Sequence, residues 1–185
     1  MGIRGGPPPP HPLHPALPAP GHPGVHAGER PDPAVHATLA ELRTDGQTVY
    51  FTGHSLGGAL AMLAGARLYL EEPFLAADGV YTYGQPRTCD RLLAEAFHQG
   101  FGGRMYRFVN NNDIVPQLPP KPVYTHVRAL RYFDSKGRLH ESMPLLSALG
   151  DRAGGLTADP FAPASDGVRD HLMRHYLAAL EHNLA

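Results

Sequence analysis

Hydrophobic residues recur along this chain at two different spacings, and each spacing predicts a different element. Val35, Leu39 and Leu42 fall on one helical face, which predicts a short helix over residues 34–43. The β-branched and aromatic run over residues 48–52 predicts a strand. The chain therefore enters its patterned part with a helix followed by a strand.

A long helix is expected directly after that strand, ending near Glu72 and Pro73. Leu60, Leu63 and Ala64 form its predicted apolar stripe. Small residues near its start permit close backbone packing against the preceding strand. We therefore expect a strand, a tight turn and a helix in immediate succession.

Strands and helices continue to alternate beyond residue 73. The expected elements are a strand over 79–84, a helix over 89–98, a strand over 104–110, a hairpin from 124–134 and 138–141, and a closing amphipathic helix over 168–185. Alternation of this kind is typical of parallel sheets. The sequence therefore predicts an α/β fold, with a mostly parallel sheet, flanking helices and a late antiparallel hairpin.

Residues 1–33 differ from the rest because proline and glycine are dense there and aliphatic periodicity is nearly absent. Such a segment cannot bury enough apolar area to offset the entropy of ordering it, so we expect a disordered or polyproline-like segment. Its histidines lack metal-ligand spacing, and no metal is expected. These histidines are His11, His14, His22 and His26. The folded domain is expected over residues 34–185.

Composition narrows the range of partners. The 185 residues carry a formal net charge of −1, which does not favour a nucleic-acid partner. No apolar run reaches the length of about 18 residues that a transmembrane helix needs. Cys89 is the single cysteine, so no intrachain disulfide can form. The first residues lack the apolar core of a secretory signal, and the chain as written is expected in the cytoplasm.

The segment Gly53-His54-Ser55-Leu56-Gly57 carries the strongest chemical signal in the chain. Gly-x-Ser-x-Gly between a strand and a helix predicts a nucleophile elbow, in which a sharp turn exposes the serine hydroxyl. We expect both flanking glycines to be required because a Cβ there would collide with the neighbouring strand and helix. The start of the helix offers free amides, and Leu56 N–H is the expected first donor to an oxyanion.

A serine nucleophile needs a base and an acid that orients the base. In α/β folds with such an elbow, these residues follow along the chain in the order serine, acid, histidine. Asp113 comes just after the strand over 104–110, at the end of the sheet where ligands bind. Asp90, a helix cap, and Asp134, in the hairpin turn, are the alternatives. We favour Asp113.

The base is expected late in the chain. His171 is preferred at the start of the last helix, and His175, one turn later, is the alternative. The side chain of His54 is expected to point away from the serine. Three further histidines are disfavoured by their positions on the hairpin or far along the last helix. They are His126, His140 and His182. Asp170 is expected to cap the last helix.

Several segments together resemble the fungal-type (class 3) lipase family of the α/β-hydrolase superfamily. The segments are Phe51 to Ala61, Tyr83 to Arg87, Arg107 to Pro120, Tyr124 to His126, and Asp170 and His171 with Tyr176. The resemblance implies a triad of Ser55, Asp113 and His171, a lipid or small ester as substrate, and no cofactor. It also implies that Val115, Leu118 and Leu172 border the acyl groove, and that Gln85 and Pro86 support the elbow from behind.

The chain departs from that family at its start. Members carry an upstream strand that supplies a second oxyanion donor, followed by a helical lid, whereas Val25 to Gly28 resembles only the segment after the lid. We therefore expect a partial α/β-hydrolase with an unpaired strand edge, open to self-association. The leading hypothesis is a serine hydrolase of lipid-like esters. The alternatives are a truncated, weakly active or inactive remnant, and a serine peptidase or acyltransferase.

Overall fold

The computed structural model describes residues 33–44, 46–142 and 164–184, which belong to the compact unit Pro31–Ala185. The disorder expected for residues 1–33, the four histidines there and the resemblance of Val25 to Gly28 lie outside the described residues, except that Pro33 begins the first helix.

Five strands form one sheet in the order β1-β2-β3-β4-β5. The first four run parallel, and β5 is antiparallel to β4. The strands are β1 (Tyr50–His54), β2 (Gly79–Tyr83), β3 (Met105–Asn110), β4 (Leu130–Phe133) and β5 (Leu139–His140). The α/β prediction, with a mostly parallel sheet and a late hairpin, is therefore confirmed.

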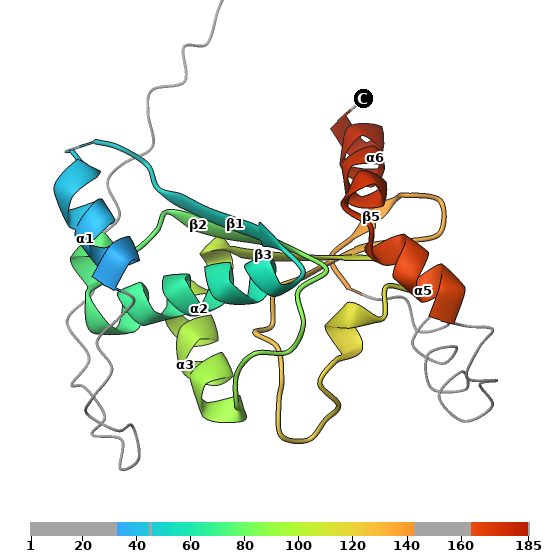
Figure 1. The fold of residues 1–185 in the computed structure, drawn as a ribbon, viewed down its shortest axis with the longest axis horizontal. Coiled ribbons are helices and arrows are strands. Elements are labelled where there is room, and N and C mark those ends of the chain that lie inside the picture. The colour runs from blue at the N-terminus through green and yellow to red at the C-terminus, as the bar shows by residue number, and fades with distance from the viewer. Residues whose placement is uncertain (1–32, 45, 143–163, 185) are drawn as a thin grey trace, which may run out of the picture. The chain divides into compact units, whose positions relative to one another are not determined.

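Helices lie on both faces of this sheet, as Figure 1 shows. The α-helices are α1 (Pro33–Leu42), α2 (Leu56–Glu71), α3 (Arg91–Phe101), α5 (Ala164–His171) and α6 (Met173–Leu184). Three short 3-10 turns connect other elements: η1 (Pro73–Leu75), η2 (Gly102–Arg104) and η3 (Val115–Gln117). No described helix is long and apolar enough to cross a membrane.

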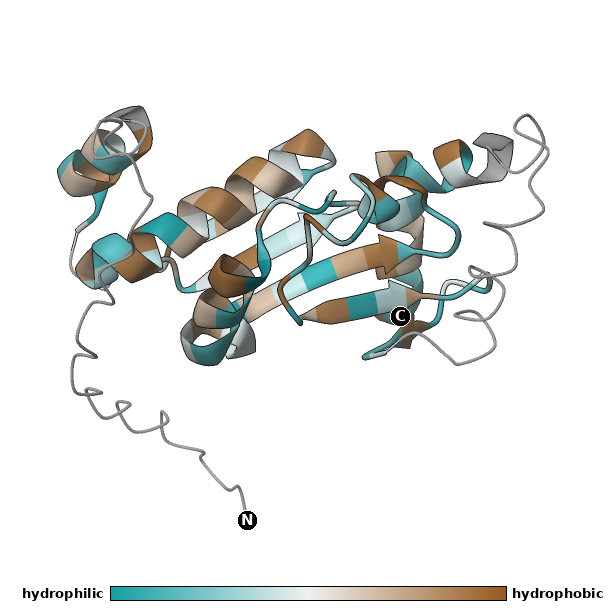
Figure 2. Ribbon diagram, turned by 90° about the horizontal axis from the view of Figure 1, so that it is seen from below, coloured by the Kyte–Doolittle hydropathy of each residue, from teal (hydrophilic) through white to brown (hydrophobic). Residues whose placement is uncertain are grey.

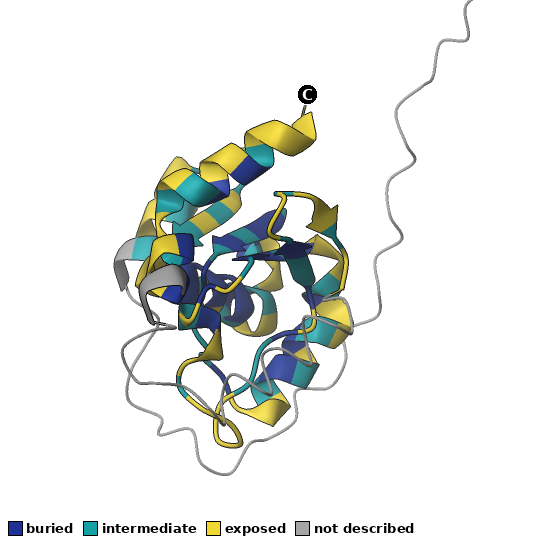
Figure 3. Ribbon diagram, turned by 90° about the vertical axis from the view of Figure 1, so that its right-hand side faces the viewer, coloured by how far each residue is buried: buried dark blue, intermediate teal, exposed yellow. Residues whose placement is uncertain are grey.

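Two hydrophobic clusters occupy the opposite faces. The larger packs α2 and α3 on one face, around Met62, Val80 and Phe97. The smaller packs Tyr176 of α6 against Phe108 and Phe133 on the other face. Alternate residues of each strand point to alternate faces, so one strand serves both clusters. Buried residues accordingly gather between the sheet and its helices (Figure 3).

The apolar stripe predicted for α2 is wrong. Leu60 and Leu63 are 59% and 37% exposed, whereas Met62 and Ala66 of the same helix are buried. Hydrophobic residues run along α2 on more than one side (Figure 2), so periodicity alone did not select the packed face. Gly65 explains the outcome: a Cβ there would lie 2.7 Å from Val80 Cγ2, so α2 packs on the sheet through its small residues.

The C-terminal part also differs from prediction. The first hairpin strand begins at Leu130, and residues 124–129 form a loop with one bridge, between Thr125 and Cys89. The single closing helix is instead two, α5 and α6, which meet at Leu172. His171 is therefore the last residue of α5, and the chain bends directly after it.

Candidate active site

Ser55 lies on a sharp turn between β1 and α2. Its φ of 57° and ψ of −125° place it in the left-handed half of conformational space, unusual for a residue with a side chain. Its N–H donates to the Tyr83 carbonyl at 2.9 Å, and its carbonyl accepts from the first turn of α2. These bonds anchor the turn to the neighbouring strand and to the helix.

The two glycines of the elbow motif are not equivalent. A Cβ on Gly53 would overlap the backbone of Gly57, so the first glycine is required for the chain to turn back so closely. A Cβ on Gly57 would meet nothing within 4 Å, so the expected collision there is absent among the described residues. Gly58 takes that role instead, because its Cβ would lie 3.0 Å from the Gly53 carbonyl oxygen and 3.3 Å from Gln85 Cβ.

Gln85 supports the elbow from behind, as the family resemblance implies. The side chain is fully buried, accepts from Thr82 Oγ1 at 2.8 Å and donates to Thr88 Oγ1 at 3.2 Å. Both of its side-chain groups are thus satisfied within the turn that follows β2.

Asp113 lies in the loop that follows β3 and is 2% exposed. Its carboxylate accepts from Val115 N at 2.9 Å and from the Tyr176 hydroxyl at 2.6 Å. Burying a carboxylate is costly unless hydrogen bonds replace its water, and these donors satisfy that requirement. The acid is therefore held in one orientation before any substrate is present.

His171 joins Asp113 to Ser55 through hydrogen bonds on both of its ring nitrogens. Its Nδ1 lies 2.9 Å from Oδ2 and 3.0 Å from Oδ1 of Asp113, and its Nε2 lies 2.8 Å from Ser55 Oγ. A carboxylate only accepts, so Nδ1 carries the hydrogen and Nε2 is free to accept from the serine hydroxyl. The structure thus brings together all three residues that the sequence predicted, from the turn after β1, the loop after β3 and the end of α5.

Asp170 does not cap a helix as expected. It is buried, and its carboxylate accepts from Asn111 Nδ2 at 2.8 Å and Asn112 N at 3.2 Å, while its carbonyl accepts from Asn110 Nδ2 at 2.9 Å. Asp170 therefore fastens the end of α5 to the loop that carries Asp113. Asp170, which directly precedes His171, therefore helps to fix the distance between His171 and Asp113.

His54 has a role that the motif did not reveal. Its Nε2 donates to the His171 carbonyl at 2.6 Å, and the two rings lie 4.5 Å apart between centroids, tilted by 31°. The variable position of the elbow therefore positions the backbone and the ring of the base. The expectation that its side chain points away from Ser55 missed this contact with His171.

Gly84 lies directly against the bond between acid and base. A Cβ there would lie 2.7 Å from Asp113 Oδ2 and 2.8 Å from His171 Nδ1, and its φ of 57° also favours glycine. No pattern in the sequence marked this glycine as part of the site. Its closeness to residues 29 and 87 positions away can be seen only in three dimensions.

Tyr176 is a further hydrogen-bond partner of Asp113. Its hydroxyl donates to Asp113 and accepts from Asn110 N at 3.0 Å, and its side chain is fully buried. Burial, together with the adjacent Asp113 charge, raises the pKa of this phenol well above its ordinary value. Tyr176 is therefore a neutral donor.

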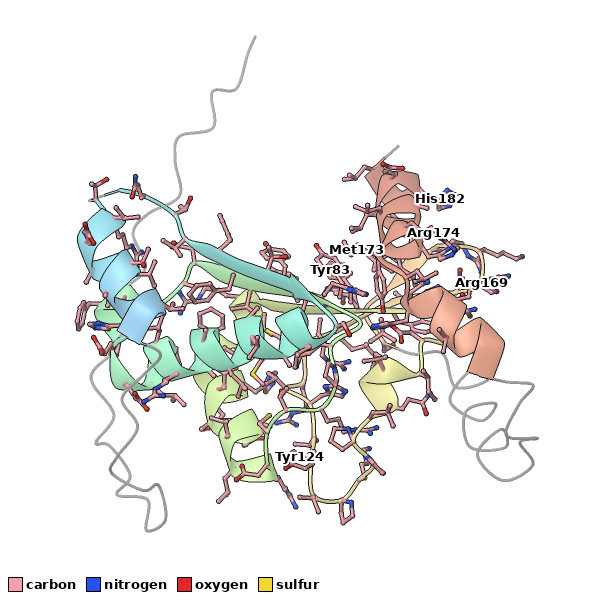
Figure 4. All side chains as sticks on the ribbon, in the orientation of Figure 1. Tyr83, Tyr124, Arg169, Met173, Arg174 and His182 are labelled. Atoms are coloured by element: carbon pink, nitrogen blue, oxygen red, sulfur yellow. The ribbon has the colours of Figure 1, made fainter. Side chains whose placement is uncertain are left out.

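Figure 4 shows Tyr83 and Met173, neighbours of Tyr176 in the same cluster, on the α6 side of the sheet and Tyr124 on the other.

The alternative acids and bases lie elsewhere. Asp90 caps α3 by accepting from Leu93 N at 2.8 Å, and Asp134 closes the hairpin by accepting from Lys136 N at 2.8 Å. His126 contacts the Pro116 carbonyl, His140 contacts Asp134, and His175 contacts Arg174. His182 is exposed on α6 (Figure 4). None of them contacts Ser55 Oγ.

The predicted oxyanion donor and the residues predicted to border a groove are exposed or half-buried. Leu56 begins α2, and among the described residues no carbonyl accepts from its N–H, as expected for the first amide of a helix. Of the three residues predicted to border a groove, Leu118 and Leu172 are 48% and 39% exposed and Val115 is half-buried. Within the described residues no cluster of side chains could hold a metal ion.

A mostly parallel sheet with a serine elbow before a helix places the chain in the α/β-hydrolase class. The model of the class 3 lipases matches residues 26–123, more than half of the chain. The chain therefore belongs to the class 3 lipase family. The matched range includes Ser55 and Asp113 and ends before His171.

The curated relatives that match this chain carry the names of lipases. Triacylglycerol lipase OBL1 of Nicotiana tabacum is 41% identical over 112 residues, covering 55% of this chain and 20% of the relative. Secreted mono- and diacylglycerol lipase 1 of Fusarium solani is 38% identical over 104 residues, covering 52% and 30%. The solved triacylglyceride lipase of Rhizomucor miehei is similar with a TM-score of 0.49 and 31% identity, covering 58% of this chain and 42% of that one. The matches with the two curated relatives thus span a fifth to a third of those proteins.

Proposed function

We propose that this chain hydrolyses carboxylic esters of acylglycerols or other lipid-like substrates through an acyl-enzyme on Ser55. The observation that carries the proposal is the continuous relay from Ser55 Oγ through His171 to Asp113, with spacings of 2.8 and 2.9 Å. Membership of the class 3 lipase family supports an ester of a lipid as the substrate.

In the proposed reaction, Ser55 Oγ attacks the ester carbonyl while its proton moves to His171 Nε2. Asp113 stabilises the imidazolium that forms and keeps Nδ1 protonated. The negative charge on the carbonyl oxygen is stabilised by Leu56 N–H and by the positive end of the α2 dipole. The alcohol then leaves with the proton from Nε2, and a water molecule activated by the same nitrogen releases the acid.

Exposed apolar residues that adjoin Ser55, Asp113 and His171 along the chain support a lipid-like substrate over a small polar one. Leu56 is 68% exposed, Ile114 is 39% exposed, and Leu118 and Leu172 are also open to solvent. A group of exposed apolar side chains is typical of a surface that binds apolar ligands. We assign the acyl chain to this surface, with Val115, Leu118 and Leu172 along its border.

The experiment is labelling with a fluorophosphonate probe, which forms a bond with an activated serine. We expect the wild-type chain to be labelled and Ser55→Ala to lose labelling. Ser142→Ala is the matched control, because Ser142 is exposed and contacts none of the three relay residues, and it should be labelled like wild type. An unlabelled wild type, or equal labelling of Ser55→Ala, would contradict the proposal.

A second candidate is a lipase-like protein that turns over esters weakly or not at all. It is favoured by the open edge of β1, beyond which the described residues place no further strand that could carry a second oxyanion donor. Loss of one oxyanion donor costs about 10²- to 10³-fold in kcat. Steady-state hydrolysis of a short-chain p-nitrophenyl ester separates the candidates: labelling without turnover supports the second, and turnover that depends on Ser55 supports the first.

Self-association is part of the same proposal. β1 is the first strand of the sheet order, and among the described residues its outer edge pairs with no other strand. An open edge offers unpaired backbone groups to another chain. We expect sedimentation velocity to show dimers or larger species, and a monomer at all concentrations would contradict pairing through this edge.

A further inference from the structure

A cavity of about 420 Å³ lies between β3, β4 and the loop before β4, apart from the serine relay. None of its lining residues is Ser55, Asp113 or His171. The charged and polar residues that matter most in its wall are Arg107, His126, Arg128, Arg131 and Glu141. Three arginines against one glutamate make this wall positive.

Arg107 is the unusual member. It is 8% exposed, yet its guanidinium makes no hydrogen bond and no ion pair with any described residue, and its Nε is buried without a partner. A buried cation without an acceptor is costly, because it has lost its water and gained nothing in exchange. Burial first, and to a smaller extent the nearby charge of Arg87, lower the pKa of Arg107 to about 10. The side chain remains a cation at neutral pH.

Two neighbours of Arg107 also carry a buried nitrogen without a hydrogen-bond partner among the described residues. Arg87 donates through Nη1 to the carbonyls of Gln117 and Pro119, but its Nε is also buried without a partner. His126 donates through Nε2 to the Pro116 carbonyl at 2.7 Å, so its buried Nδ1 is an unprotonated acceptor. Burial first, and then Arg107, lower the pKa of His126 to about 3, so this histidine contributes no charge at neutral pH.

The acidic side chains nearby do not neutralise Arg107. Glu95 binds Arg128, with both carboxylate oxygens 2.8 Å from Nη2. Glu141 lies 3.8 Å from Arg131 Nη2 with its side chain 87% exposed. The two rim arginines thus have carboxylate partners, whereas no described carboxylate pairs with Arg107.

We propose that this cavity binds a phosphate group, with Arg107 as its principal ligand and Arg131 at the rim. A guanidinium presents planar donors that match phosphate oxygens in pairs, and charge-assisted bonds of this kind are stronger than neutral ones. The bound group would supply the acceptors that Arg107 lacks. The phosphate can come from free inorganic phosphate or from the head group of a phospholipid.

The test uses the full chain and measures the melting temperature in sodium phosphate against sodium chloride of matched ionic strength. Phosphate should raise the Tm by about 3 °C or more at saturation, because a ligand that binds only the folded state stabilises it. Isothermal titration of inorganic phosphate should give one site per chain. Arg107→Gln should weaken the affinity about tenfold or more, in line with the loss of a charge-assisted hydrogen bond.

Arg91→Gln is the matched control, because it removes the same charge from an exposed position on α3 outside the cavity. It should bind phosphate like wild type. If Arg107→Gln does not fold, Arg131→Gln keeps the test open and should weaken binding by a smaller factor, about threefold. A wild type that binds neither inorganic phosphate nor phosphatidic acid saturably, or equal binding by the Arg107 and Arg91 variants, would overturn the proposal. If a carboxylate of this chain already occupied the cavity, phosphate could not bind there, and the wild type would show no saturable binding.

The source of the phosphate is separated by a second titration, with short-chain phosphatidic acid and short-chain phosphatidylcholine below their micelle concentrations. Binding of inorganic phosphate as tight as that of phosphatidic acid identifies a site for the free ion. Binding of phosphatidic acid alone, lost in Arg107→Gln, identifies a lipid head group. Because each readout is binding, an inactive Ser55→Ala chain serves equally well, and failure here leaves the proposed ester hydrolysis untouched.

Discussion

The two sides of the serine elbow differ in how completely the described residues cover them. On the side of β3, α5 and α6, the polar groups around Asp113 are paired, and Tyr176 is buried. On the side of β1 and the outer face of α2, Leu60 is exposed and a Cβ on Gly57 would meet nothing. The donors that hold Asp113 therefore lie on the side that the described residues cover, and none of them comes from the outer face of α2.

The largest expected effect comes from the acid on the paired side. Asp113→Asn should lower kcat for a p-nitrophenyl ester by about 10⁴-fold, because an amide in its place no longer holds His171 in the tautomer that accepts from Ser55. Asp90→Asn is the control, because asparagine caps a helix as well as aspartate does. A loss of less than about tenfold in Asp113→Asn would show that the relay is not the catalytic path.

Gly84→Ala tests the packing beneath the relay. Its methyl group would press on both Asp113 and His171, and displacing a catalytic group by about 1 Å costs about 10²-fold in rate. Gly103→Ala, where a Cβ meets nothing within 4 Å, is the matched control and should retain full activity. Equal kcat/KM in the two variants would contradict the assigned role of Gly84.

Tyr176→Phe removes one hydroxyl without changing the shape of the core. The loss leaves Asp113 with one donor fewer and Asn110 N without its acceptor, so the free energy of unfolding should fall by about 1–3 kcal/mol. We expect kcat to fall about tenfold with KM unchanged. Urea unfolding and steady-state kinetics measure the two effects. Tyr124→Phe, at a position 42% exposed, should change neither.

The smallest effect belongs to the open side. Leu60→Gln should change the free energy of unfolding by no more than about 0.5 kcal/mol, because Leu60 is already 59% exposed. Met62→Gln, two residues away and fully buried, should cost more than about 2 kcal/mol. If urea unfolding gave similar losses for both variants, the outer face of α2 would be covered in the folded chain and the comparison would fail.

Local pattern was enough to predict most of the elements and to single out Ser55 as the candidate nucleophile. The strand, the glycines and the helix around Ser55 are contiguous, and short-range sterics alone specify such a turn. The order of strands and helices likewise predicted a parallel sheet, as observed. Asp113 could be nominated because it follows a strand, a position defined along the chain.

Only the tertiary structure decided which surfaces meet. The buried face of α2 was mispredicted because Leu60 and Leu63 are more hydrophobic than their small neighbours, whereas close packing on Val80 selects the small ones. The contact of His54 with the His171 carbonyl joins residues 117 positions apart. Hydrophobic periodicity along the sequence depends only on residues a few positions apart. Contacts between residues as distant along the chain as His54 and His171 form only when the whole chain packs.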